Sequence, residues 1–115
     1  MRTNRTKQIS PRRIASDIYR RAGCPVAEPV APSQLAEAAG VTVRPMVCVV
    51  SCDGMSYPGR EGWRIEVHPG MHRGKRERTI AELLAGIALD RRGLDTDANT
   101  VAVGDELIRR WRSAP

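Results

Sequence analysis

The chain has 115 residues, a formal net charge of +6, a hydrophobic fraction of 41% and no phenylalanine. This length suits one small domain that buries roughly two thirds of the surface of its unfolded chain. No apolar run approaches the ~20 residues of a membrane span, and the N-terminus lacks the apolar core of a signal peptide. We therefore expect a cytoplasmic protein without membrane contact, in which Cys24, Cys48 and Cys52 are reduced thiols.

The positive charge is unevenly placed along the chain. Residues 1–23 hold seven basic residues and one acidic residue, which accounts for the whole net charge of +6. Basic and acidic residues balance over the remaining 92 positions. We predict a flexible basic arm over residues 1–9 and a single domain over residues 10–115.

Two helices are expected in the N-terminal third. The first begins with Ser10 as N-cap and Pro11 as first helical residue, and it ends at Gly23. A proline-rich irregular segment follows. The second helix is short, with Pro32 in its first turn and Gly40 just beyond its last residue.

The middle of the chain predicts strands. Residues 41–50 are rich in β-branched side chains, with a break or edge position at Pro45, and Asp53-Gly54 is a turn signal. Residues 55–57 are expected to be extended, and residues 63–67 alternate between apolar and charged side chains, as in a half-buried strand. A small, mainly antiparallel sheet is expected to pack on a central helix.

The central helix is predicted over residues 78–90, after a basic linker at 73–78, and Gly93 is a suitable stop. Its apolar residues recur at helical spacing and form one stripe: Ile80, Leu83, Leu84 and Ile87. A last helix follows, capped by Asp97 or Asn99. Its expected inner face consists of Val101, Leu107, Ile108 and Trp111. The predicted fold class is therefore α+β, with N-terminal helices, a small sheet, a buried central helix and a C-terminal helix.

The order strand, turn, Thr79-Ile80-Ala81 and buried helix resembles the active-site region of the ImmA/IrrE family of zinc peptidase domains. In that family the helix begins T-x-A-H-E-x-x-H and carries two zinc-binding histidines and a glutamate general base. Matching the threonines places Glu82 at the first histidine, Leu83 at the glutamate and Gly86 at the second histidine. The resemblance thus implies a zincin-like fold that has lost its H-E-x-x-H motif.

Two further segments carry the same resemblance. Residues 29–41, PVAPSQLAEAAGV, are similar to the family's segment before its first strand, and residues 97–102 are similar to its E-A-N helix. The latter match places Asp97 at the third zinc ligand. Glycine has no side chain to bind zinc and leucine cannot accept a proton, so we expect no bound cofactor and no enzymatic activity. Glu82 and Asp97 are then interpreted as ordinary surface or cap acids.

An alternative metal site is present in the spacing Cys48-x3-Cys52 and His68-x3-His72, which approximates a Cys2His2 zinc site. A continuous strand would hold the two cysteines about 13 Å apart, too far to share one ion. Pro69-Gly70 also prevents the two histidines from lying on one helix. Only a tight bend over residues 48–52 would allow the site to form.

The leading functional hypothesis is a catalytically inactive ImmA/IrrE-like domain that binds a partner protein as a regulatory module of a bacterium, phage or mobile element. The alternative is a small nucleic-acid-binding accessory protein that uses its basic arm. The candidate phosphate contacts in that case are Arg2, Arg5, Lys7, Arg12 and Arg13. No aromatic side chains accompany them, so base-specific recognition is not expected.

Overall fold

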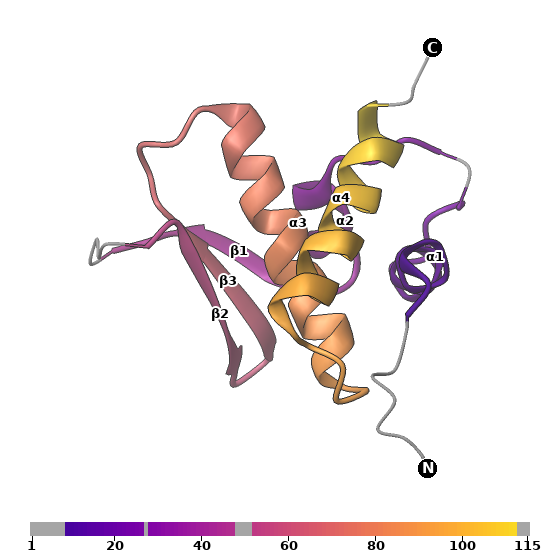
Figure 1. The fold of residues 1–115 in the computed structure, drawn as a ribbon. Coiled ribbons are helices and arrows are strands. Elements are labelled where there is room, and N and C mark those ends of the chain that lie inside the picture. Colours follow the sequence, from indigo (N-terminus) through magenta and orange to yellow (C-terminus); the bar gives the residue numbers. More distant parts are fainter. Residues whose placement is uncertain (1–8, 27, 48–51, 113–115) are drawn as a thin grey trace.

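A computed structural model describes residues 9–26, 28–47 and 52–112, which form a layered α+β domain (Figure 1). The expected fold class is therefore confirmed. The elements in chain order are α1 (Pro11–Arg21), α2 (Pro32–Ala38), β1 (Thr42–Pro45), β2 (Gly54–Gly59), β3 (Gly62–Val67), α3 (Arg73–Asp90) and α4 (Asp97–Arg112). No helix in these described ranges is both long and apolar enough to cross a membrane.

The sheet has three strands in the order β1-β3-β2 and is mixed. β2 and β3 form an antiparallel hairpin whose turn is Arg60-Glu61, whereas β1 runs parallel to β3. The expectation of a mainly antiparallel sheet is confirmed in that six residue pairs join β2 to β3 and four join β1 to β3, but the parallel pairing of β1 was not foreseen. Local turn signals specify a hairpin, but the pairing of β1 with β3 is long-range and leaves no local signature. Within the predicted strand 41–50, only β1 is a strand, and residues 48–50 lie outside the described part.

The two N-terminal helices begin and end where their caps predict. The Arg13 backbone N–H donates to Ser10 Oγ at 3.3 Å, and Pro11 is the first helical residue of α1. Gly23 and Gly40 follow α1 and α2 with positive φ angles of 72° and 84°, a conformation that glycine adopts without strain. Ile9, placed in the predicted arm, is half-buried and packs against the core.

Helix α3 is longer than expected, because the basic run 73–78 is helical and not a linker. His72 caps the helix, and its Nδ1 accepts from the Lys75 backbone N–H at 3.3 Å. Arginine and lysine are good helix formers. The helical turn that they occupy also contains the buried Glu77, and this side chain fixes the turn against α2. The prediction of a linker was therefore wrong.

A long-range cap joins α2 to α3. The carboxylate of Glu77 accepts from the Ser33 backbone N–H and from Ser33 Oγ, both at 2.8 Å. Ser33 lies in the first turn of α2, where backbone N–H groups have no partner within the helix. The buried charge of Glu77 therefore satisfies the N-terminus of α2, and Arg76 Nη1 adds a contact at 3.4 Å.

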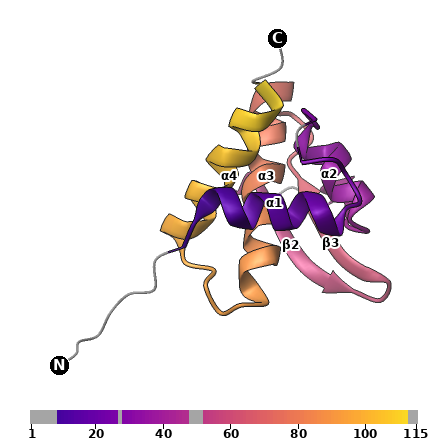
Figure 2. The ribbon, with the colours of Figure 1, turned by 90° about the vertical axis from the view of Figure 1, so that its right-hand side faces the viewer.

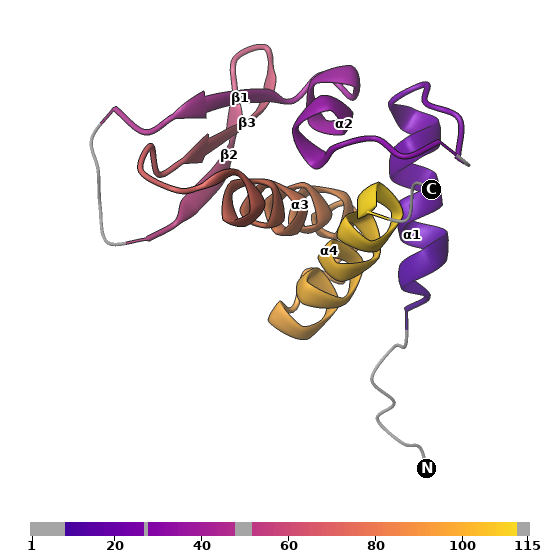
Figure 3. The same cartoon turned by 90° about the horizontal axis from the view of Figure 1, so that it is seen from above.

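Helix α3 lies at the centre of the fold. The sheet packs on one side of it, while α4 packs on another and α1 crosses both helices (Figures 2 and 3). Its buried apolar residues are therefore not confined to one stripe: Ile80, Ala81, Leu84, Ala85, Ile87 and Leu89. Leu83, expected in the stripe, is half-buried.

Helix α4 differs from the prediction at both its cap and its inner face. The Asn99 backbone N–H donates to Thr96 Oγ1 at 3.2 Å, so Thr96 is the cap and Asp97 is the first helical residue. The Asn99 side chain donates to the Leu94 carbonyl instead. Leu107 and Ile108 are buried and Trp111 is half-buried, as expected, but Val101 is 44% exposed. The buried face runs through Val103 and Gly104, and Val101 lies about 200° away from Val103 around the helix.

We predict that Leu84→Ala lowers the free energy of unfolding by about 2–5 kcal/mol, because it leaves a cavity beside a side chain that is only 3% exposed. Val101→Ala is the matched control on the exposed face of α4 and should change stability by no more than about 0.5 kcal/mol. Urea denaturation of both variants measures the difference. Equal losses would contradict the observed placement of Val101.

Candidate functional site

The residues that the sequence aligns with zinc ligands lie where α3 crosses α4. A Cβ atom placed on Gly104 would lie 2.8 Å from Cγ and 3.3 Å from Cα of Glu82. A Cβ atom on Gly86 would have Thr100 Cγ2 as its nearest neighbour, at 4.0 Å. Glu82 and Gly86 thus both face α4, and the absence of a side chain at Gly104 permits the close approach of the two helices.

Glu82 is half-buried at this crossing, so its interpretation as an ordinary surface acid was wrong. Burial raises the pKa of its carboxyl, Arg78 opposes this shift, and Asp105 and Asp53 add to it. A raised pKa in the folded state means that ionising Glu82 costs folding stability as the pH rises above the ordinary value of a glutamate. Within the described ranges no hydrogen bond to its carboxylate compensates this cost.

The other two aligned residues point elsewhere. A Cβ atom on Gly54 would lie 3.0 Å from Leu83 Cδ1, which places Leu83 against the start of β2. Asp97 is exposed in the first turn of α4. In the described part of the chain, no group of three or more histidine, cysteine, aspartate or glutamate side chains is arranged to hold a metal ion.

We predict opposite effects for two glycine-to-alanine changes at the helix crossing. Gly104→Ala should destabilise the fold by about 1–3 kcal/mol, since its methyl group would force α4 away from the backbone of α3. Gly86→Ala should be neutral or stabilising by up to about 1 kcal/mol, because its methyl group meets only an ordinary contact and alanine favours a helix. Thermal unfolding of the two variants tests the pair. A stable Gly104→Ala protein would show that the crossing is looser than described.

The alternative Cys/His site is only partly visible, because Cys48 lies outside the described residues. Cys52 is exposed. His68 Nδ1 accepts from the Gly70 backbone N–H at 3.0 Å, and His72 Nδ1 caps α3. A neutral imidazole that accepts at Nδ1 carries its proton on Nε2, so neither ring offers a lone pair to a metal in this arrangement.

His68 and His72 do share one surface hollow of about 470 Å³, which Asp53 and Lys75 also line. Lys75 Nζ lies 3.5 Å from an Asp53 carboxylate oxygen, and its positive charge opposes the binding of a cation there. The structure therefore brings the two histidines together without arranging them as ligands.

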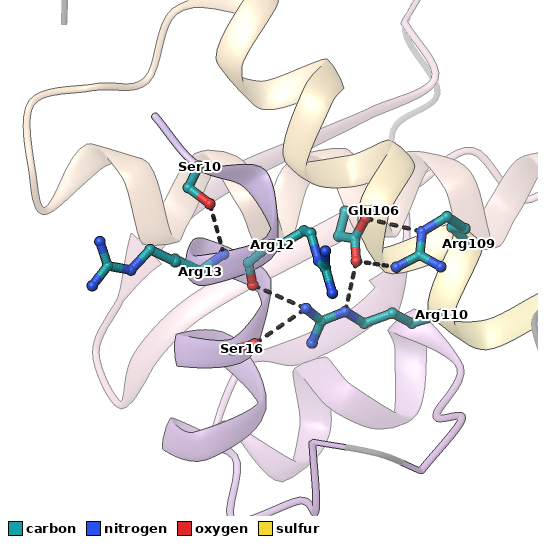
Figure 4. A network of polar contacts seen from close by, with 7 residues as sticks. All are labelled: Ser10, Arg12, Arg13, Ser16, Glu106, Arg109 and Arg110. Carbon is teal, nitrogen blue, oxygen red and sulfur yellow. Dashed lines mark hydrogen bonds and ion pairs between the residues drawn. The ribbon is translucent and has the colours of Figure 1, made fainter. Parts of the chain in front are cut away.

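A groove lined by several arginines lies between α1 and α4, and we call it the arginine groove (Figure 4). Its volume is about 590 Å³. Five of the side chains that line it are arginines, three from α1 and two from the last turns of α4: Arg12, Arg13, Arg20, Arg109 and Arg110. Ser16, Val26 and Glu28 complete the lining.

Glu106 organises the α4 side of the arginine groove. Arg109 donates to both of its carboxylate oxygens, from Nε at 3.0 Å and from Nη2 at 2.5 Å. Arg110 Nε donates to Glu106 Oε2 at 2.9 Å. The hydrogen bonds from Arg109, and then those from Arg110, lower the pKa of Glu106 despite its burial. Glu106 thus remains ionised, and its stabilising contribution is lost only as the pH falls below the ordinary range of a glutamate.

Arg110 joins α4 to α1. Its Nη2 donates to the Arg12 carbonyl at 2.9 Å and to Ser16 Oγ at 3.1 Å, and its guanidinium lies 5.5 Å from the centre of the buried Tyr19 ring. The Arg110 side chain is only 13% exposed. Arg110 therefore works mainly inside the fold, whereas Arg12, Arg13, Arg20 and Arg109 are exposed.

The sequence predicted part of this groove. Arg12 and Arg13 line it, whereas Arg2, Arg5 and Lys7 lie outside the described residues. The contribution of Glu106, Arg109 and Arg110 was missed. Their i, i+3 and i, i+4 spacing in the last helix is a recognisable ion-pair pattern, but nothing local shows that this pattern faces α1.

Comparison of this chain with protein-family models, curated proteins and solved structures finds no match.

Proposed function

We propose that this chain is a non-catalytic domain of the ImmA/IrrE type, which works in the cytoplasm by binding a partner protein without cutting it. The observation that carries the proposal is the crossing of α3 and α4. Glu82 and Gly86 face α4, as two zinc-binding side chains four residues apart on one helix would. Hydrolysis by a zinc site needs three protein ligands, an open position for water and a general base. Here a glycine replaces one ligand, and Leu83 replaces the base.

The arrangement of the elements also supports this proposal. A sheet strand, a turn, a buried helix and a second helix that crosses it follow one another in β3, α3 and α4. The aligned acid, Asp97, begins the same helix whose Thr100 and Gly104 contact α3. Asp97 itself is exposed in the first turn of α4, so the two positions on α3 are the aligned ones that lie at the crossing.

We expect the purified native chain to contain no stoichiometric zinc, and we expect the combined variant Glu82→His, Leu83→Glu, Gly86→His to bind one zinc ion per chain. The three changes restore the H-E-x-x-H pattern, with the two histidines on the face of α3 that meets α4 and the glutamate at the adjacent position 83. Elemental analysis after dialysis measures the metal, and circular dichroism verifies the fold. Adding Asp97→Ala to the combined variant should weaken zinc binding, since it removes the carboxylate that the resemblance assigns as third ligand.

Each outcome decides a separate part of the proposal. One zinc ion in the native chain would contradict its non-catalytic character. A folded combined variant that binds no zinc would contradict the ImmA/IrrE relationship.

The partner protein requires a surface, and the free edge of β2 supplies one beside α3. β2 pairs only with β3 among the described strands. The His68 backbone N–H donates to the Asp53 carbonyl at 2.8 Å, so alternate residues from Asp53 to Gly59 bond to β3. The backbone groups of Gly54 and Ser56 therefore point away from the sheet. A peptide added there as a strand would lie next to Leu83, since Gly54 packs against that side chain.

We predict that Ser56→Pro abolishes partner binding while leaving the sheet intact, because it removes an outward N–H group that does not bond to β3. Ser56→Ala keeps that N–H group and is the matched control. Affinity purification from the source cells with all three chains as bait should identify proteins retained by the native and alanine chains but not by the proline chain. A partner retained equally by all three would not be using this edge.

A further inference from the structure

We infer that the arginine groove binds the phosphodiester backbone of a nucleic acid, a role separate from the proposed protein binding at β2. The groove combines cations from two segments that are 96 to 97 residues apart in the sequence, Arg12 and Arg13 on α1 and Arg109 on α4. Only the fold brings them together. Charge is therefore concentrated at one place on the surface to a degree that the sequence does not reveal.

Three exposed cations of the groove, Arg12, Arg13 and Arg109, are available to a ligand, whereas Arg20 pairs with Asp17. Within the described ranges, neither Arg12 nor Arg13 has an ion-pair partner, and only their backbone atoms take part in the contacts that hold α1. Arg109 is 59% exposed although Glu106 fixes one edge of its guanidinium. Glu106 thus orients Arg109 and neutralises the internal charge of Arg110, which leaves the outer arginines to contact phosphate groups.

The cations extend along α1 and are not gathered at one point. Arg13 and Arg20 also line a second hollow, of about 450 Å³, on the other side of α1, where Arg92 joins them and Asp17 pairs with both Arg20 and Arg92. The distance from Arg13 to Arg20 is roughly 10 Å along the helix axis. One strand of duplex DNA carries a phosphate about every 3.4 Å along its axis, so this row of cations spans about three phosphates. Such a row fits a polyanion better than a single small anion.

Contacts to bases are not part of this site. Among the described residues, no aromatic side chain lines the arginine groove, and Trp111, the one aromatic residue of α4, instead contacts Arg73 and Arg112 through its ring. Guanidinium groups without stacking aromatics bind phosphates and carry little sequence information. Binding should therefore be non-specific in sequence and strongly dependent on salt.

The test compares two pairs of substitutions that remove the same charge from the full chain. Arg12→Gln with Arg13→Gln removes two positive charges from the α1 side of the groove. Arg44→Gln with Arg60→Gln removes two positive charges from the sheet, where both arginines are exposed and neither has an ion-pair partner in the described structure. Fluorescence anisotropy with a 20-base-pair DNA duplex and with single strands of DNA and RNA, at several salt concentrations, measures affinity and its salt dependence. The groove pair should weaken binding about ten-fold and reduce the log–log salt slope by up to about 1.8 for the duplex, and the sheet pair should leave both nearly unchanged.

A third variant separates the groove from the N-terminal arm. Arg2→Gln, Arg5→Gln and Lys7→Gln together should lower affinity further but leave the effect of the groove pair in place. Equal losses of affinity for the groove pair and the sheet pair would mean that only the net charge of the chain matters, and this result would overturn the inference. Loss of all binding in the arm variant with no effect of the groove pair would overturn it also, as would no binding at low salt. Equally effective competition by polyglutamate of matched charge would assign the groove to an acidic protein instead.

Discussion

Helix α3 has neighbours on almost every side, and the rest of the domain is arranged to satisfy that burial. The sheet covers one side, α2 and α1 cover others, and α4 crosses it closely. Small side chains at Ala81 and Ala85 are fully buried and let these neighbours approach, while Ile80 and Leu89 fill the larger spaces between them. A helix buried in this way has few positions left on which a polar side chain can reach water.

This constraint explains the arrangement of the two buried carboxylates. Glu77 on α3 is 3% exposed, and its charge is placed where the first turn of α2 needs hydrogen-bond acceptors. Glu106 on α4 is also buried, and two guanidinium groups surround its carboxylate. Burial of an ion without such partners would cost several kcal/mol, so each carboxylate fixes the position of the element that compensates it. Glu77 thereby sets α2 against α3, and through Arg110 Glu106 sets α1 against α4.

The parts of the fold that the sequence predicted are those with local causes. Ser10, Gly23 and Gly40 act through their own backbone conformation or through neighbours three residues away, and the structure has them as expected. The errors arose where a distant contact decided the outcome. The start of α3 depends on the burial of Glu77 against Ser33, the parallel pairing of β1 depends on β3, and the face of α4 depends on where Gly104 meets Glu82. The candidate site divides in the same way, because Arg12 and Arg13 were visible as a charge cluster but their proximity to Arg109 was not.

In the arginine groove, buried and exposed arginines occupy different structural positions. Arg110 bonds to Glu106, to the Arg12 carbonyl and to Ser16, so it holds α1 against α4 and defines the groove from inside. Arg12, Arg13 and Arg109 lie on the outside of the same contact. Because Arg110 bonds to the backbone carbonyl of Arg12, the side chain of Arg12 is left free of this structural role. The cations of α1 can therefore be exchanged without loosening the helix, whereas loss of Arg110 or Glu106 would leave a buried charge unpaired and separate α1 from α4. A groove built in this way keeps its shape independently of whether a polyanion occupies it.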